Sequence, residues 1–249
     1  MSAVSSVSCL QANEWICGEY VRDRADELTD ATVEHIVITA TAIGIALVVA
    51  LPLALLARRW RLAAGGILGA TTVLYTVPTL AMYALLLPVF GISMSVVVCG
   101  LVLYSLTVLV RNTLEGLRAV PDEAREAARG LGYGRLRLLL TVELPLALPA
   151  LMAGVRIATV SAVSLTTVGA IVGYGGLGNL IYSGMDSYFK AQVLTASVLC
   201  VVLAVASDLL LLLAQRLLTP WARAGGRRRW RRRAAVPQQD TLTKISGTV

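Results

Sequence analysis

Two ionisable side chains lie inside long apolar runs, where an unpaired charge is costly. Arg156 follows Pro145 by eleven residues, and Asp208 precedes Arg216 by eight. If the two runs are antiparallel helices, both charges lie at a similar depth. We therefore expect the guanidinium and the carboxylate to meet as an ion pair or through a shared water. Two charges at one depth would also suit a path for a polar solute, and this alternative stays open.

A glycine-rich stretch, Gly173-Tyr174-Gly175-Gly176-Leu177-Gly178, formally matches the dinucleotide pattern G-x-G-x-x-G. That pattern binds a pyrophosphate only between a strand and a helix, whereas an apolar helical run precedes it here. We expect an irregular turn in which small residues permit close helix approach. A gate or a docking rim for another protein is the functional alternative. No G-x-x-x-x-G-K-[ST] sequence is present to cradle nucleotide phosphates.

The four cysteines fall into two pairs. Cys99 and Cys200 lie in apolar runs, where cysteine behaves as a small hydrophobic residue. Cys9 and Cys17 lie in a polar segment. If that segment faces an oxidising compartment, the two could form a disulfide; two free thiols are the plainer alternative. The sole histidine is His35, and no His/Cys cluster has the spacing of metal ligands, so we expect no metal site.

The composition indicates the elements that position these residues. Hydrophobic residues make up 57% of the 249-residue chain and charged residues only 15%, whereas soluble domains are nearer a quarter charged. No charged residue occurs from Leu62 to Val110, and a membrane-spanning helix needs about 20 apolar residues. The sequence therefore predicts an all-α integral membrane protein and argues against a soluble one.

Five transmembrane helices account for the apolar runs. The first is Ile36–Leu56, and 62–110 is long enough for two, with a kink at Pro78 and a break near Pro88 and Gly91. The fourth begins around Leu146–Leu151 and ends near Gly173, and the fifth is Ala191–Leu218. A sixth crossing follows if Thr79–Phe90 spans the membrane separately.

The orientation follows from lysine and arginine, which are retained on the cytoplasmic side. An outer amino end and a cytoplasmic carboxyl end leave only Arg22, Arg24 and Lys190 outside. We therefore expect three parts: an extracytoplasmic segment (1–34), a transmembrane domain (35–220) and a basic cytoplasmic tail (221–249).

The tail is rich in arginine next to the last predicted span. Such a cluster typically binds anionic lipid head groups, at roughly 1 kcal/mol for each basic side chain. Nucleic acid is the rival partner, but the tail is short and tethered to a membrane, so we expect lipid and not nucleic acid. The arginines are Arg227, Arg228, Arg229, Arg231, Arg232 and Arg233.

A polar loop (111–145) interrupts the apolar chain before the fourth span. Pro121, Asp122 and Glu123 suit the first turn of a helix, which Gly130 and Gly132 can end. A second short helix is expected at 135–140. The alanines at 127 and 128 would leave a smooth face for another protein, although an ordinary amphipathic loop fits the physics equally well.

The spacing in this loop resembles the EAA motif of permease subunits of bacterial ABC importers. The motif is EAA, three residues, Gly, nine residues and I-x-L-P, and this chain departs from it only in having valine for isoleucine. The similarity continues through "LPLALPALMAGVRIATV" and "VGAIVGYGGLGNLI", and it points to the osmoprotectant branch, which imports glycine betaine, carnitine and choline. The matching residues are Glu126, Ala127, Ala128, Gly132, Val142, Leu144 and Pro145.

The resemblance implies a division of labour. The loop would seat coupling helices in a separate ATPase dimer that binds ATP and Mg, so this chain itself would have no cofactor and no enzymatic activity. A second permease subunit, identical or related, and an external substrate-binding protein would complete an importer in the bacterial inner membrane.

The nearest alternative is a permease for methionine or another amino acid. A self-contained channel or secondary transporter would show internal repeats or more intramembrane charge, and a membrane enzyme would show a polar catalytic cluster.

Overall fold

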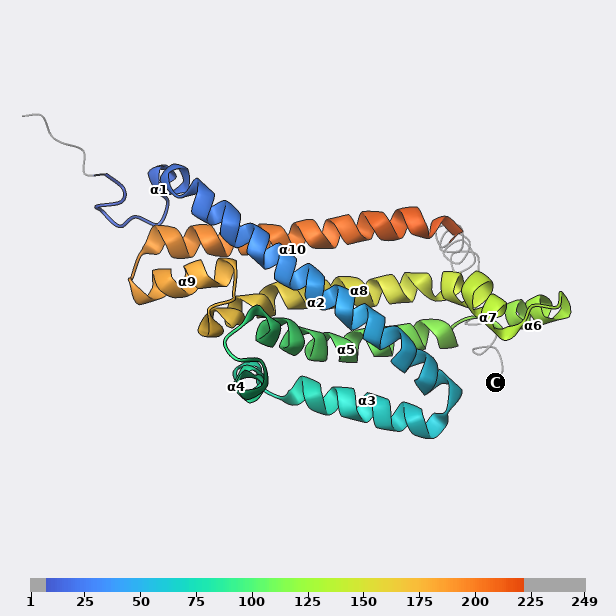
Figure 1. Ribbon diagram of the computed structural model, residues 1–249. Helices are drawn as coiled ribbons and strands as arrows, with labels where there is room; N and C mark the ends of the chain where they lie inside the picture. The colour runs from blue at the N-terminus through green and yellow to red at the C-terminus, as the bar shows by residue number, and fades with distance from the viewer. Residues whose placement is uncertain (1–7, 222–249) are drawn as a thin grey trace, which may run out of the picture.

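The computed structural model describes residues 8–221, and all regular structure within this range is helical (Figure 1). This confirms the all-α prediction. The arginines predicted to bind lipid, from Arg227 to Arg233, lie outside the described residues. In chain order the elements are α1 (Gly18–Asp23), α2 (Ala25–Arg59), α3 (Arg61–Thr76), α4 (Thr79–Phe90), α5 (Met94–Arg118), α6 (Asp122–Gly130), α7 (Arg135–Leu138), the π-helix η1 (Leu139–Glu143), α8 (Leu144–Thr166), the 3-10 helix η2 (Thr167–Val172), α9 (Leu177–Asp186) and α10 (Lys190–Leu218).

Four helical segments of the described chain are long and apolar enough to cross a membrane: α2, α5, the continuous stretch Arg135–Val172 around α8, and α10. A fifth candidate is the pair α3 and α4, whose axes bend by 101° at their junction. By itself α4 extends only about 18 Å at 1.5 Å per residue, less than a hydrocarbon core of about 30 Å. The fold thus agrees with five spans, and the alternative of a sixth crossing at Thr79–Phe90 does not hold.

The bend between α3 and α4 is sharper than the kink expected at Pro78. Val77 has extended backbone, with ψ of 127°, because the residue before a proline is pushed out of the helical region. Pro78 is extended as well, with ψ of 138°. The helix therefore breaks there. The predicted turn before the next span lies at Gly91, whose φ of +65° ends α4, while Pro88 remains inside that helix.

The molecule has two distinct ends (Figure 1). The short helices α1 and α9 lie at one end, beside the start of α10, and α6 and α7 lie at the other, beside the α2–α3 junction. Helix α2 runs without interruption through residue 34, where the sequence suggested a boundary between an amino-terminal segment and the membrane domain.

The core is built around α5, which packs against α2 on one side and α8 on the other. An alanine recurs every fourth residue of α2, and all four members of this stripe are at most 1% exposed. Residues four apart share one helix face, so the stripe lets the helix axes approach closely. Its members are Ala42, Ala46, Ala50 and Ala54.

Glycines provide the same closeness between α5 and α8. A Cβ on Gly154 would lie 2.6 Å from the Cβ of Asn112, and a Cβ on Gly116 would lie 2.9 Å from the carbonyl oxygen of Ala147.

By contrast, α10 has only two buried residues, Ala191 and Ala196. Its apolar side chains are largely exposed, as expected for a helix whose outer face meets lipid or another subunit.

Candidate coupling loop and glycine turn

Helix α6 forms where the loop sequence predicts it. Pro121 precedes the first residue, and Asp122 and Glu123 lie in the first turn, where acidic side chains complement the helix dipole. At the other end, Gly130 is the last helical residue and Gly132 has a left-handed φ of +80°. The amide of Gly132 donates to the carbonyl of Arg129 at 2.9 Å and so closes the last turn.

The three residues of the EAA motif do not share one face of α6. Glu126 and Ala127 are exposed, whereas Ala128 is 5% exposed and packs against its own chain. Successive residues of a helix point about 100° apart, so three consecutive positions cannot all face a partner. Glu126 and Ala127 are therefore the two that lie open, and Ala128 anchors the helix instead.

The second helix of the loop, α7, is shorter than the predicted range 135–140. It ends at Leu138, and the chain then passes through the π-helix η1 into α8. Val142, Leu144 and Pro145, which complete the motif, are half-buried at this junction. Three leucines of the loop are exposed by more than half, an apolar surface in an otherwise polar segment; they are Leu131, Leu136 and Leu140.

A buried acid in the motif was not identified from the sequence. Glu143 is 5% exposed, and both of its oxygens accept hydrogen bonds from the Arg58 guanidinium, Arg58 Nη1 lying 2.6 Å from Oε2. Arg125 Nε donates to Oε1 at 3.0 Å. The available signal was a lone acid among apolar residues, but the sequence does not indicate which of the many arginines would pair with it.

The charges at 156 and 208 meet as expected. Arg156 Nε lies 2.8 Å from Asp208 Oδ1, and Nη2 lies 2.8 Å from Oδ2. The contact is direct and involves both carboxylate oxygens, the strong geometry for an arginine–carboxylate pair. It joins α8 to α10, the least buried of the long helices.

The glycine turn, residues 173–178, follows the 3-10 helix η2. Gly173 has φ +79°, and Gly176 combines φ +54° with ψ −120°. The Asn179 side chain holds the turn from inside: its oxygen accepts from the Gly175 amide at 3.1 Å, and its nitrogen donates to the Gly173 carbonyl at 3.2 Å. An ordered irregular turn at the end of a membrane helix is what the sequence predicted.

The glycine turn also packs tightly against its neighbours. A Cβ on Gly176 would lie 2.7 Å from the backbone nitrogen of His35 on α2, and one on Gly175 would lie 2.5 Å from the amide nitrogen of Ala170. A Cβ on Gly178 would overlap the backbone of Thr167. The imidazole of His35 is fully buried, and its Nε2 lies 3.0 Å from the Val163 carbonyl oxygen. The glycines therefore seat the turn on α2 and on the 3-10 helix η2.

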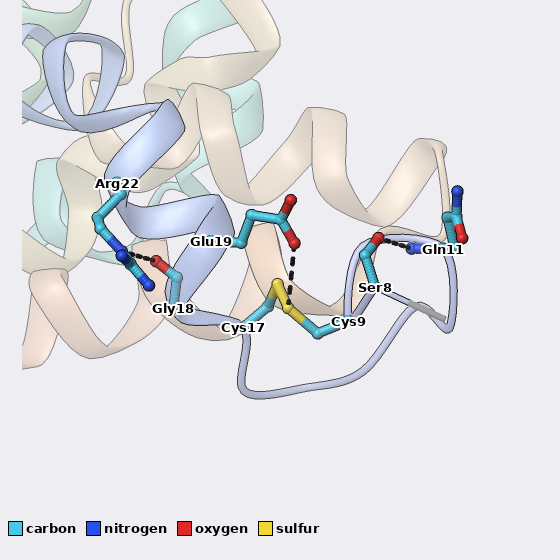
Figure 2. The surroundings of a disulfide bond; sticks show 7 residues. All are labelled: Ser8, Cys9, Gln11, Cys17, Gly18, Glu19 and Arg22. Carbon is cyan, nitrogen blue, oxygen red and sulfur yellow. Dashed lines mark hydrogen bonds between the residues drawn. A yellow bond between two sulfur atoms is a disulfide. The ribbon is translucent and has the colours of Figure 1, made fainter. Parts of the chain in front are cut away.

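A disulfide joins Cys9 and Cys17 and closes a short loop before α1 (Figure 2). This disulfide loop, residues 9–17, is fastened to the α9–α10 junction by Asn13. The Asn13 side chain donates to the Tyr188 carbonyl at 2.9 Å and accepts from the Lys190 amide at 3.0 Å. The pairing is one of the two alternatives left by the sequence.

Next to the disulfide loop, the ring of Tyr20 packs edge-on against Phe189, with centroids 5.2 Å apart. Burial raises the pKa of the Tyr20 phenol above its ordinary value, and the Glu27 carboxylate raises it further. The phenol therefore stays neutral where α1 packs against the start of α10.

One group of metal-ligand side chains gathers closely in residues 8–221, formed by Cys9, Cys17 and Glu19. The two sulfurs are bonded to each other and are not free to bind an ion. Glu19 Oε2 lies 4.0 Å from Cys9 Sγ (Figure 2), and because a disulfide sulfur carries no proton, this is a contact without a hydrogen bond. The arrangement is structural.

The described residues thus form several candidate membrane-spanning helices joined by an exposed helical loop, the architecture of a multi-pass membrane protein. Residues 37–224 match the model of the family "Binding-protein-dependent transport system inner membrane component". The chain belongs to this family and is a multi-pass inner-membrane protein.

Curated relatives agree over most of the chain. The Osmoprotectant import permease protein OsmW of Salmonella typhimurium is 35% identical, over 81% of this chain and 96% of that protein. The Choline transport system permease protein OpuBB of Bacillus subtilis is 33% identical, over 81% and 93%. The Glycine betaine/carnitine/choline transport system permease protein OpuCB of the same organism is 30% identical, over 81% and 93%. The chain is accordingly the permease component of an ABC transporter and not its ATPase.

The fold resembles those of solved ABC transporter complexes. A chain of the MetNI methionine ABC transporter in an inward-facing conformation superposes with a TM-score of 0.70 at 20% identity, covering 79% of this chain and 98% of that one. An amino acid ABC transporter gives a TM-score of 0.66 at 17% identity. At such low identity the likeness concerns the fold alone.

Proposed function

We propose that this chain forms the translocation pathway for a small osmoprotectant such as glycine betaine, choline or carnitine, in an importer driven by ATP. The proposal is supported by the relatives named for these solutes, which are 30–35% identical over 81% of the chain. The path itself would lie between this chain and a second permease subunit, identical or related. A separate substrate-binding protein outside the membrane would select and deliver the solute.

The observation that carries the coupling role is the shape of α6. Its exposed Glu126 and Ala127 and the exposed leucines nearby form a surface that a partner can cover, and Gly132 supplies a turn at its end. We assign this surface to an ATPase dimer, which would bind ATP and Mg and drive the transition between inward- and outward-facing states. The glycine turn at the other end would serve as a gate or as part of the rim for the binding protein.

The orientation we propose places α6 in the cytoplasm and α1 outside. Arg58 and Arg59 at the end of α2 lie at the same end as α6 (Figure 1), in accord with the retention of basic residues inside. The disulfide of Cys9 and Cys17 lies at the opposite end, in accord with an oxidising compartment. Arg227 to Arg233 would then follow the last span on the cytoplasmic side and bind anionic lipids.

Import of methionine or another amino acid is the second candidate, because methionine and amino-acid transporters share the fold. The osmoprotectants are favoured because the resemblance to their permeases includes the sequence itself. Cells with and without the gene should be compared for uptake of labelled glycine betaine, choline, carnitine and methionine. Gene-dependent uptake of methionine alone would replace the osmoprotectant proposal.

The coupling role is tested with Glu126→Lys and Gly132→Asp. Each variant should insert normally yet lose uptake to the level of cells without the gene, because the first reverses a charge on the docking surface and the second places a side chain at φ +80°. Glu115→Gln, at an exposed acid on α5, is the control and should transport normally. Wild-type uptake by Glu126→Lys at equal membrane abundance would argue strongly against the assignment.

A further inference from the structure

We propose that Glu143 is a mechanical relay that joins the coupling helix α6 to the inner ends of α2 and α8, so that the three move as one body. The inference rests on the proposed function, because it concerns how a pull on α6 reaches the membrane helices. It assigns a positioning role to Glu143, Arg58 and Arg125, which we call the Glu143 cluster.

The contacts of the Glu143 cluster connect four elements. Glu143 is the last residue of the π-helix η1, directly before α8, and Arg58 lies one residue before the end of α2. Arg125 belongs to α6 and donates in three directions: to Glu143 Oε1 at 3.0 Å, to Asp122 Oδ1 at 2.5 Å and to the Leu117 carbonyl of α5 at 2.7 Å. One carboxylate and two guanidiniums thus tie the loop to three long helices.

The cluster differs from an ordinary surface ion pair. The Glu143 side chain is 6% exposed, and those of Arg125 and Arg58 are 14% and 25% exposed. The Arg118–Glu115 pair on α5 is 3.9 Å apart, with side chains 51% and 67% exposed. Exposed pairs contribute little because water competes for both partners. A buried carboxylate that accepts from two guanidiniums has no such competition, and its charge holds the arginines in place.

Helix α6 has little else to hold it. Ala128 is its sole buried residue, and an alanine contributes only a small apolar contact. Because Arg125 is the long, half-buried side chain of this helix that reaches inward, the Glu143 cluster is the principal polar link between α6 and the membrane domain. A force on the exposed face of α6 therefore passes through Arg125 to Glu143, and from there to α8 along the backbone and to α2 through Arg58.

The π-helix fits this role. π-helical turns are rare in proteins, but those that occur are often found at functional sites. Here Glu143 is the last residue of the π-helix η1, directly before α8 begins. Coupling between distant sites needs an element that both sites bias together. The Glu143 cluster supplies a rigid connection of that kind, with all its charges paired.

The first test measures distances in the assembled complex with the ATPase. Spin labels are attached to cysteines introduced by Glu123→Cys on α6 and Arg59→Cys on α2, two exposed positions, after replacement of Cys99 and Cys200 by serine. In the otherwise wild-type complex, the distance should be the same with and without bound ATP. In the Glu143→Gln background, the distribution of distances between the two labels should broaden or shift when ATP binds. A shift in the wild-type background would overturn the proposal whether or not the Glu143→Gln protein assembles.

The second test measures ATP hydrolysed per solute imported in proteoliposomes. Glu143→Gln, Arg58→Gln and Arg125→Gln should each raise this ratio about tenfold or more, a typical size for coupling between sites. Glu115→Gln is the matched control and should not change it. A variant that merely folds poorly would lose hydrolysis and import together and leave the ratio unchanged, so an unchanged ratio in the assembled Glu143→Gln complex would reject the relay.

Import by the wild-type complex distinguishes a failure of the proposed function from a failure of the relay. If the wild-type complex imports no osmoprotectant with ATP, the proposed function is wrong. If the wild-type complex imports and Glu143→Gln imports with the same ratio, the function stands and only the relay is rejected.

Discussion

Arg156 on α8 and Asp208 on α10 form a direct ion pair, with both nitrogen–oxygen distances at 2.8 Å, although the two residues are 52 positions apart. Their side chains are 27% and 33% exposed when the protein is considered without a bilayer. In a membrane that exposure is to lipid or to another subunit, so each charge depends on the other for compensation. The pair is thus a charged attachment of α10 to α8.

Replacing one member of this pair should cost more than replacing both. Arg156→Leu or Asp208→Leu leaves a lone charge at membrane depth and should lower the amount of folded protein in the membrane severalfold. The double variant should recover it, because an apolar pair needs no compensation. Membrane abundance and thermal unfolding, followed by size-exclusion chromatography in detergent, measure the effect.

The double variant also separates the two interpretations of the pair. Recovery of both abundance and uptake identifies a structural ion pair, whereas recovery of abundance without uptake identifies a solute path. Single variants as abundant as wild type would show that neither charge needs its partner.

The two positive-φ glycines of the glycine turn should differ in tolerance. Gly173→Asn keeps a left-handed conformation that asparagine accepts, and it has open space for a side chain, so it should cost about 1 kcal/mol. Gly176→Asn should cost about 3 kcal/mol, because φ +54° with ψ −120° suits only glycine and a Cβ would strike His35. Thermal unfolding of the purified protein distinguishes them, and equal losses would contradict the packing of the turn on α2.

The thiol content should reveal the disulfide loop. Of the four cysteines, only Cys99 and Cys200 are free, so protein denatured without reductant should bind two equivalents of a thiol reagent, and protein denatured after reduction should bind four. Mass spectrometry counts them. Four equivalents before reduction, in protein isolated from the membrane under oxidising conditions, would contradict both the disulfide and the external placement of this segment.

The contact between α5 and α8 should reject a larger side chain. Gly154→Val places carbon atoms where Asn112 already lies, 2.6 Å from its Cβ, and such overpacking costs about 1–3 kcal/mol. Gly69→Val on α3, where an added Cβ meets nothing within 4 Å, is the matched control. The two variants should differ in melting temperature, and equal stability would argue against the tight α5–α8 interface.

The spans could be predicted because each depends on a local property. An uncharged run of sufficient length must be helical in a bilayer, since backbone groups there can be satisfied only within the helix. The helical break at Val77–Pro78 also had a local signal in the proline, although its angle of 101° did not. The end of α6 at Gly130 was likewise encoded nearby, because Gly132, two residues later, accepts positive φ.

The Glu143 cluster had no comparable local signal. Its members come from positions 58, 125 and 143, and the loop alone offers several other arginines. Ala128 shows the same limit, because a motif describes which residues occur and not which of them face a partner. Arg156 and Asp208 were exceptions, since they lie within apolar runs and a membrane leaves such charges few possible partners.

What the sequence determined by itself is the order of the apolar helices and the position of the helical loop before the last two long ones, because hydrophobic length and helix-breaking residues act over short stretches of chain. Tertiary structure alone decided that Glu143 binds Arg58 and Arg125, that Gly176 rests on His35, and that Ala128 turns inward. These contacts join residues far apart along the chain, and they depend on how closely the alanine and glycine faces of α2, α5 and α8 allow the helices to approach.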